Sequence, residues 1–395
     1  MTPVWQQIDK DLAALQDAGQ FKQLKTLNRP MGPESEIDGV GKVVVLCSND
    51  YLGLANHPEV VAAGIESQKK WGPGTGSVRF ICGTFGYHHE LERTIAELSA
   101  TEAATTYVSC WNANEAVIPT LMAIGGDSVC AISDELNHAS IIDAIRLGRQ
   151  INKASKSAVY KHSDMADLEA KLKEAASATC RIVVTDGVFS MEGDIAKLDQ
   201  IHALCRQYDA MLIVDDSHGV GVCGPTGRGV AEHYALHGKI DCMTGTLGKA
   251  LGGAAGGYIA SRRNLIELMV QKSRPQIFSN AVPSGTAGAA KKAIEILMRD
   301  TSRVEKLREN VHYMREGLKK RGFETVEGPS AITPIILGPT AKAIAASKRL
   351  LELGVFVIGF GYPVVPEGTA RLRVQISAGH EKAHLDRALD AFSKL

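Results

Sequence analysis

One lysine and one aspartate have surroundings that suit covalent cofactor chemistry. Lys249 lies in the glycine- and threonine-rich segment TGTLGKALGG, where backbone amides can approach an anion. Asp215 follows the apolar run MLIV, and a carboxylate there is costly to bury without a cationic or hydrogen-bonding partner. A protonated pyridine nitrogen is such a partner. The pair therefore predicts pyridoxal phosphate, with Lys249 forming the imine and Asp215 keeping the ring nitrogen protonated.

Two histidines support this interpretation. His138 in SDELNHASIIDA and His218 in VDDSH both lie beside predicted strand ends. Alone, each is better explained as a core histidine bonded to a carbonyl, but together with Asp215 and Lys249 they indicate a flat ring held between side chains. Other histidines, in helical or loop surroundings, are expected to have ordinary surface roles: His88, His89, His162, His233, His237, His312, His380 and His384.

Two glycine patterns resemble nucleotide sites but lack their context. Gly219, Gly221 and Gly224 spell G-x-G-x-x-G after a predicted strand, yet the turn sequence GPTGRG follows where a dinucleotide site needs a helix. Gly248 and Lys249 lack the spacing and the following Ser or Thr of a P-loop. The eight cysteines contain no C-x-x-C pair, so neither zinc nor a disulfide framework is expected. We expect no metal site, and reduced thiols as in the cytoplasm.

The composition is that of an ordinary globular protein. Apolar residues make up 45% and charged residues 22% of 395 residues, and Lys plus Arg equals Asp plus Glu at 44 each. No overall field favours nucleic acid or an anionic membrane. The N-terminal stretch MTPVWQQIDKDLAALQ is not a signal peptide, and 18 apolar residues never occur together. We therefore expect a cytoplasmic protein with no nucleic-acid or membrane partner.

Short apolar runs alternate with segments of helical period. Strands are expected at 43–50, 181–187 and 211–219, and helices at 88–100, 165–176 and 197–209. This alternation predicts an α/β fold with a mainly parallel sheet. Ligands bind such sheets at the carboxyl ends of the strands, where SND, TDG and DDSH fall.

The pattern changes after about residue 285. Long charged helices precede the short runs ITPIILG, VFVIGFG and RLRVQISA, which indicates a smaller α+β domain. We therefore expect three parts: an N-terminal segment at 1–45, a large cofactor domain at 46–285 and a small C-terminal domain at 286–395.

Five motifs together resemble the α-oxoamine synthases: SNDYLGL, SDELNHASIIDA, TDGVFSMEGD, VDDSHGVG and GTLGKALGG. They are long, stand in the order of that family, and the resemblance runs from about residue 20 to the end. It implies the aspartate-aminotransferase type (fold type I) architecture and a homodimer with active sites at the subunit interface. It also implies a reaction that joins glycine or another small amino acid to an acyl-CoA.

The resemblance also implies roles for individual residues. Lys249 is the imine-forming lysine, Asp215 the partner of the pyridine nitrogen, and His138 stacks on the ring. His218 and Ser190 bond the phenolic oxygen. The phosphate is held by Thr246, Ser109, Cys110 and Trp111, and Ser279 reaches the cofactor of the neighbouring subunit. Arg373 resembles the arginine that binds the substrate carboxylate, with Asn49 beside it.

Within the family the resemblance is strongest to the glycine C-acetyltransferases, also called 2-amino-3-ketobutyrate CoA ligases. SVRFICGT, SRPQIFSN and GFGYPVVPEGTARLRVQISAGH carry it, and Val364 stands where 8-amino-7-oxononanoate synthases tend to have Thr. Trp111 and FGYH after ICGT depart from the acetyltransferase pattern. The expected reaction is glycine plus acetyl-CoA, giving 2-amino-3-oxobutyrate and CoA, or the reverse in threonine breakdown. The alternative is a decarboxylating synthase with a longer acyl-CoA, similar to 8-amino-7-oxononanoate synthase or serine palmitoyltransferase.

Other classes of protein remain as competing hypotheses. An aminotransferase would share Lys249 and Asp215. A nicotinamide oxidoreductase would need a helix to begin at the Gly219 pattern, and a non-catalytic scaffold would not need the lysine.

Overall fold

A seven-stranded sheet forms the centre of the larger part of the molecule. The computed structural model describes residues 2–18, 20–126, 128–252 and 254–395. In the sheet, β5, β4, β6, β7 and β8 run parallel, whereas β9 is antiparallel to both β8 and β3. The strand order is β3 (Ala103–Tyr107), β9 (Gly257–Ser261), β8 (Cys242–Thr246), β7 (Ala210–Asp215), β6 (Cys180–Asp186), β4 (Val129–Asp134) and β5 (Lys156–Tyr160).

The central strands are apolar on both faces because helices cover both. Ile182 and Val184 of β6 belong to one apolar cluster, and Val183 between them belongs to the other. The first cluster packs against α4 (Cys110–Ile124), α5 (Ala139–Ile151) and α9 (Arg263–Lys272). The second packs against α3 (Gly86–Ser99), α6 (Met165–Glu174), α7 (Leu198–Gln207) and α11 (Ser284–Arg299). Alternate residues of one strand thus face opposite helical layers.

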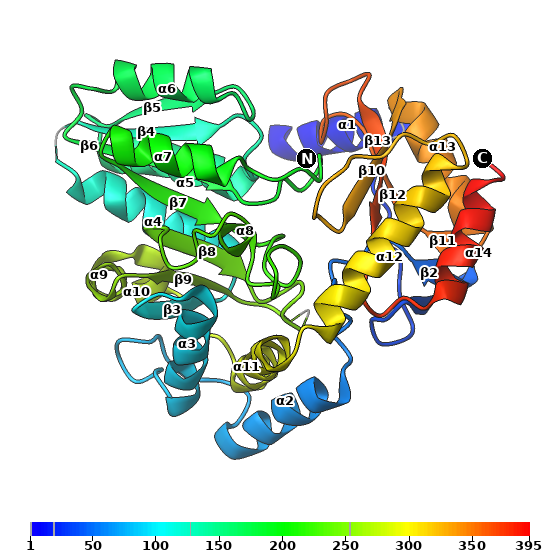
Figure 1. Cartoon of the computed structure of the whole chain (residues 1–395), viewed down its shortest axis with the longest axis horizontal. Helices are drawn as coiled ribbons and strands as arrows, with labels where there is room; N and C mark the ends of the chain where they lie inside the picture. Colours follow the sequence, from blue (N-terminus) through cyan, green and yellow to red (C-terminus); the bar gives the residue numbers. More distant parts are fainter. Residues whose placement is uncertain (1, 19, 127, 253) are drawn as a thin grey trace.

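Two small sheets lie apart from the large one (Figure 1). One joins β10 (Ile332–Gly338), β13 (Ala370–Gln375) and β12 (Ile358–Phe360) in antiparallel pairs. The other has the order β1 (Glu34–Ile37), β2 (Gly41–Val45), β11 (Val355–Phe356). The remaining helices are α1 (Pro3–Asp17), α2 (Pro58–Trp71), α8 (Val230–His233), α10 (Arg274–Phe278), α12 (Ser302–Lys319), α13 (Thr340–Glu352) and α14 (Lys382–Phe392).

The α/β prediction with a mainly parallel sheet and a smaller C-terminal sheet is confirmed. One strand was placed wrongly: the run 43–50 was expected in the parallel sheet, but only Gly41–Val45 is a strand, and it pairs with β1 and β11. The apolar residues of this strand are buried by the small sheet and its helices. An apolar run therefore predicted a buried strand correctly but did not reveal to which sheet the strand belongs. The division into three domains stays a prediction.

The glycine pattern at 219–224 opens no helix. This segment folds back on Asp216 in turns, with the Gly219 and Val220 amides donating to the Asp216 carbonyl at 3.1 Å each. The next helix, α8, begins only at Val230. The structural requirement of the dinucleotide fingerprint is therefore missing. In the described part of the chain, no helix combines the length and the apolar character needed to cross a membrane.

Helices α2 and α11 approach each other through small residues, which gives a test of the packing. A Cβ on Gly288 would lie 2.6 Å from the Ser67 Cβ and 2.8 Å from the Ala63 carbonyl oxygen. We expect Gly288→Ala to lower the free energy of unfolding by about 1–3 kcal/mol, because the helices must move apart. For Gly285→Ala on the same helix, the nearest atom is the flexible end of Gln68 at 3.3 Å, and the Gly64 carbonyl oxygen lies at an ordinary contact distance of 3.5 Å. It should be neutral or stabilising by up to ~1 kcal/mol. Urea unfolding measures both, and equal effects would contradict this packing.

Candidate active site

A cavity of about 230 Å³ opens at the carboxyl ends of the central strands. Each strand contributes at the point where it ends, so residues far apart in the sequence meet there. The cavity is lined by Ser109, Cys110, Trp111, His138, Ser140, Asp186, Val188, Ser190, Asp215, Ser217, His218, Thr246 and Lys249. Every residue that was expected to contact the cofactor within one subunit is in this set.

Asp215 is 5% exposed and its carboxylate is held by three donors. The Asn114 side-chain amide donates to Oδ2 at 2.7 Å, and the Ser217 backbone N–H donates to Oδ1 at 3.1 Å. The Cys110 thiol lies 3.5 Å from Oδ2. These donors fix the orientation of the carboxylate, which can then serve as the partner of a cationic ring nitrogen.

Lys249 has the environment of a nucleophilic amine. Burial lowers its pKa below the usual lysine value, although the charge of Asp215 acts in the opposite direction. A lowered pKa increases the fraction of neutral amine near pH 7, and only the neutral amine can form a covalent bond to an aldehyde or remove a proton.

The beginning of α4 forms an anion cradle on the cavity wall. Ser109 is the N-cap and its Oγ accepts from the Asn112 backbone N–H at 3.2 Å. The amides of Cys110 and Trp111 lie in the first turn, where helix geometry leaves N–H groups without intrahelical partners. Gly257 packs directly beneath, because a Cβ there would lie 2.3 Å from the Cys110 nitrogen. A phosphate fits this donor set.

The two histidines enter the cavity from different elements. His138 is the N-cap of α5, and its ring lies edge-on to that of Trp111 with centroids 5.9 Å apart. Its pKa is lowered by desolvation. His218 is buried, and its Nδ1 lies 2.8 Å from the Tyr51 hydroxyl. Burial, together with the charges of Lys249 and Arg373, holds its pKa well below the usual value, so it is a neutral ring.

Arg373 on β13 has unsatisfied donors. Its Nε and Nη2 atoms are buried without a hydrogen-bond partner among the described residues. Burial lowers its pKa, with Tyr51 beside it. Asn49 Oδ1 accepts from Gln375 Nε2 at 2.8 Å and from the Tyr51 hydroxyl at 3.3 Å. Asn49 and Arg373 are not among the residues that line the cavity around Lys249. Two adjacent unpaired N–H groups on one guanidinium match the two oxygens of a carboxylate.

Several contributors were missed by sequence reasoning. Tyr51, Asn114 and Ser217 all bond to predicted site residues. Tyr51 and Ser217 lie inside quoted motifs, and Asn114 lies three residues after Trp111, but neither position reveals a hydrogen-bond partner. Ser279 does not line the cavity; it is the C-cap of α10, beside the Val78–Asn280 bridge. Its expected contact with a neighbouring subunit stays a prediction.

Two histidines with expected surface roles are buried instead. His88 is 0% and His380 1% exposed. Both rings bond backbone: His88 Nε2 lies 3.0 Å from the Val282 carbonyl, and His380 Nε2 lies 2.9 Å from the Val45 carbonyl. The position of a histidine in a helix or loop did not predict its exposure, because the His88 and His380 side chains pack against elements that are distant in the sequence.

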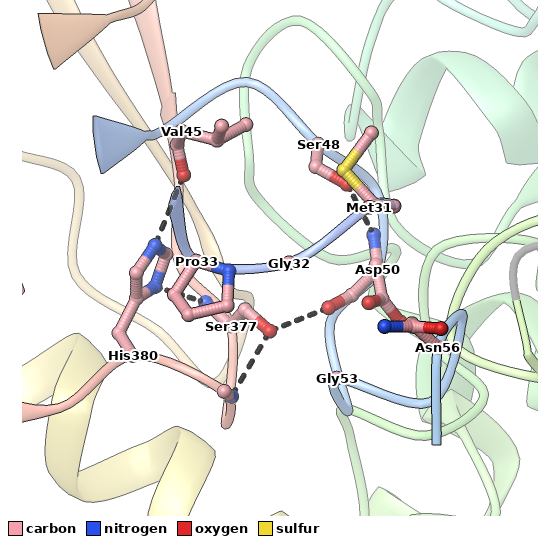
Figure 2. Close-up of a pocket in the computed structure, with 11 residues that line it drawn as sticks. Met31, Gly32, Pro33, Val45, Ser48, Asp50, Gly53, Asn56, Ser377 and His380 are labelled. Atoms are coloured by element: carbon pink, nitrogen blue, oxygen red, sulfur yellow. Dashed lines mark hydrogen bonds between the residues drawn. The ribbon is translucent and has the colours of Figure 1, made fainter. Parts of the chain in front are cut away.

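A second cavity, of about 180 Å³, is lined by Ser48, Asp50, Ser377 and His380, among others (Figure 2). Its polar groups are bonded to each other: the Ser377 hydroxyl donates to the Asp50 carbonyl at 2.6 Å, and His380 Nδ1 accepts from the Ser377 backbone N–H at 3.0 Å. Both ring nitrogens of His380 are occupied, which lowers its ability to take part in catalysis. The chemistry therefore belongs to the cavity around Lys249.

Comparisons with known proteins agree with this geometry. Residues 41–392 match the family "Aminotransferase class I and II". The chain is 47% identical over 389 residues to the 8-amino-7-oxononanoate synthase of Thermoanaerobacter pseudethanolicus, covering 98% of this chain and 96% of the relative. It is 44% identical over 386 residues to the mitochondrial 2-amino-3-ketobutyrate coenzyme A ligase of Bos taurus, covering 98% and 90%. A solved serine palmitoyltransferase from S. paucimobilis with bound PLP is 31% identical with a TM-score of 0.90, covering 98% and 96%.

The loop that carries Ser190 is anchored by a half-buried histidine, His162, which gives a pH test. His162 Nδ1 lies 3.0 Å from Asp134 and its Nε2 lies 2.9 Å from Asp194, and its ring packs edge-on to Phe189. Burial alone would lower the pKa of His162, but the hydrogen bonds and charges of the two carboxylates outweigh it and raise the pKa to about 10.

Because the folded-state pKa is raised, this stabilisation is complete below the unfolded pKa of about 6.5 and is lost as the pH rises through about 10. We expect His162→Gln to lower the free energy of unfolding by roughly 1–3 kcal/mol at pH 6. The difference from wild type should shrink by pH 10. Denaturant titrations at several pH values measure it, and a pH-independent difference would refute the charged pair.

Proposed function

The chain belongs to the α-oxoamine synthases, a family of pyridoxal-phosphate enzymes that condense an amino acid with an acyl-CoA, and we propose that it is a decarboxylating member with an acyl-CoA longer than acetyl-CoA. The observation that carries the chemistry is the meeting of Lys249 and Asp215 in one cavity, within reach of the charge of Arg373. The amine of Lys249, the carboxylate of Asp215 and the guanidinium of Arg373 are each available to bind a cofactor or an amino acid.

The longer acyl chain is favoured by the names of the relatives. Five 8-amino-7-oxononanoate synthases are 42–47% identical to this chain, and three 2-amino-3-ketobutyrate coenzyme A ligases are 43–44% identical, so the ranges overlap and only the highest identities belong to synthases. Val364, whose position is usually Thr in 8-amino-7-oxononanoate synthases, is 43% exposed and does not line the cavity around Lys249.

The second candidate is glycine C-acetyltransferase, with glycine and acetyl-CoA as substrates. The segments SVRFICGT and SRPQIFSN favour it. The ranges of identity to the ligases and to the synthases overlap. The same catalytic groups would serve both candidates, and the acyl pocket has to discriminate between them.

Pyridoxal 5′-phosphate is the cofactor, and the cavity suits each of its parts. The first-turn amides of α4, with the Thr246 hydroxyl nearby, would hold the phosphate, and Asp215 would bond the ring nitrogen. His138 and His218 would flank the ring, and Lys249 would bind the aldehyde carbon. Once bound, the cofactor supplies an electron sink for a bond broken at the α-carbon of the amino acid.

The protein groups would then divide the remaining work. Arg373 would orient the amino acid through its carboxylate by two parallel hydrogen bonds. Lys249, displaced by the substrate amine, would stand as the neutral base that takes the α-proton, for which its lowered pKa is suitable. Trp111, 39% exposed at the cavity wall, would restrict the access of water.

A homodimer in the cytoplasm is part of the proposal. The Val78–Asn280 bridge brings the exposed side chains Phe80, Ile81 and Phe278 into the neighbourhood of Ser279. Such an apolar surface favours a second subunit, and Ser279 would then lie at the interface.

The cofactor assignment is tested by reduction. Purified protein should be yellow, and borohydride should fix the cofactor onto residue 249. Lys249→Ala should lose this attachment and at least about a thousandfold in condensation rate, because both the anchor and the base are gone. The exposed Lys272→Ala is the control and should behave as wild type. Peptide mass spectrometry locates the label, and a colourless wild-type protein would sink the proposal.

The acyl specificity is tested by a substrate panel. Initial rates are measured with acetyl-, pimeloyl- and palmitoyl-CoA, each with glycine, alanine and serine, and the product mass shows whether the carboxylate is lost. We expect a longer acyl-CoA to exceed acetyl-CoA at least tenfold in kcat/KM, about 1.4 kcal/mol in transition-state binding. A maximum with glycine and acetyl-CoA would select the second candidate, and a flat profile would contradict both.

A further inference from the structure

A chain of buried hydrogen bonds runs beneath the cavity and ends on His138. Its first three members, Thr244, Asn114 and Ser140, are at most 1% exposed. The Thr244 hydroxyl and the Asn114 Oδ1 are 2.8 Å apart, the Asn114 Nδ2 and the Ser140 Oγ 2.9 Å, and the Ser140 Oγ and the His138 Nδ1 2.8 Å. The chain links β8, α4 and α5, three elements that do not follow each other in sequence.

The direction of this chain is set at Asn114. Its Nδ2 has two hydrogens, and two acceptors are in place: Asp215 Oδ2 at 2.7 Å and Ser140 Oγ at 2.9 Å. Turning the amide over would place its carbonyl oxygen against the Asp215 carboxylate and its nitrogen against the Thr244 hydroxyl. The amide orientation is therefore fixed by Asp215, and Thr244 donates to Oδ1.

The direction propagates to the imidazole. Because the Ser140 Oγ accepts from Asn114, its own hydrogen is free to point at His138 Nδ1. The Ser140 backbone N–H, which can only donate, also contacts Nδ1, at 3.3 Å. With two donors on Nδ1, the ring proton of neutral His138 resides on Nε2.

We propose that Asn114 is a positioning residue that fixes both halves of the active site, holding Asp215 as an acceptor and presenting His138 to the cavity as an Nε2–H donor. The inference rests on the proposed function for the roles of Asp215 and His138. In that reaction the donor would bond an acyl or carboxylate oxygen of a substrate. The other charged groups around this ring are Lys249 and Asp215, and Asp186 binds only the His138 backbone N–H, at 2.9 Å.

The decisive variant is Asn114→Asp, which keeps the size and shape of the side chain but reverses the direction of the hydrogen bonds from residue 114 through Ser140 to His138. Two carboxylates at this distance share a proton, so residue 114 would donate to Asp215 and accept the Ser140 hydroxyl hydrogen. Ser140 would then accept from His138, and the ring proton would move to Nδ1. Ser140→Ala removes the relay but leaves the contact between Asn114 and Asp215 intact.

Ser133→Ala is the matched control. The Ser133 hydroxyl is also buried and also accepts from an asparagine amide, Asn137 Nδ2 at 2.9 Å, but it has no contact with a histidine ring. Thermal unfolding of each variant checks that the fold is retained.

The tautomer of His138 is measured by nitrogen NMR of histidine-labelled holoenzyme, with the dissociation constant of pyridoxal phosphate measured in parallel. Wild type and Ser133→Ala should show protonated Nε2 and bare Nδ1. Asn114→Asp should shift the proton to Nδ1 and weaken cofactor binding about tenfold, because the hydrogen bond from residue 114 then competes with the ring nitrogen for Asp215. Ser140→Ala should show mixed tautomers and cofactor affinity within about twofold of wild type, since Asp215 keeps its partners.

A wild-type spectrum with protonated Nδ1, or an Asn114→Asp variant with unchanged tautomer and affinity, would overturn the inference. Failure of the proposed function would give a different result, because the wild-type protein would then bind no pyridoxal phosphate.

Discussion

Burial of a charged carboxylate at the end of the central strand governs the rest of the site. Asp215 is accepted there only because donors surround it, and Asn114 and Cys110 both come from α4. The same helix offers its first-turn amides to an anion. Helix α4 therefore supports both the phosphate site and the carboxylate that would bond the ring nitrogen. The distance between α4 and β7 sets the distance between these two sites.

The loop between β6 and α7 connects this site to the small antiparallel sheet. Ser190 lines the cavity, and the next residue, Met191, accepts through its carbonyl from Arg371 Nη1 at 3.0 Å. Arg371 lies on β13 two residues before Arg373, whose unpaired guanidinium donors are suited to a carboxylate. From the other side, His162 holds Asp194 at the end of the loop. The loop is thus fixed between two sheets, and the positions of ring and substrate groups are coupled through it.

Shared chemistry explains why the relatives divide between two reactions. In the proposed function, Lys249, Asp215 and Arg373 would act on the amino acid and the cofactor rather than on the acyl chain, so they would not discriminate between acyl-CoA substrates. Discrimination requires contacts beyond the cavity described, in a region where a second subunit would contribute. The resemblance to acetyltransferases came from the segments 77–84, 273–280 and 359–380, whereas the highest overall identities are to 8-amino-7-oxononanoate synthases.

The sequence by itself determined the α/β class, the strands β6 and β7 and the set of side chains that meet at their carboxyl ends, because apolar runs and the residues that end them are local properties. Only the tertiary structure decided that the run 43–50 leaves the large sheet, and that the Ala378 backbone N–H donates to the Tyr51 carbonyl at 2.7 Å, which brings Asn49 and Tyr51 beside Arg373. Likewise Asn114 is an unremarkable helical residue in the sequence. Its partners come from β7, β8 and α5, and such long-range pairing depends on how the layers pack rather than on any local pattern.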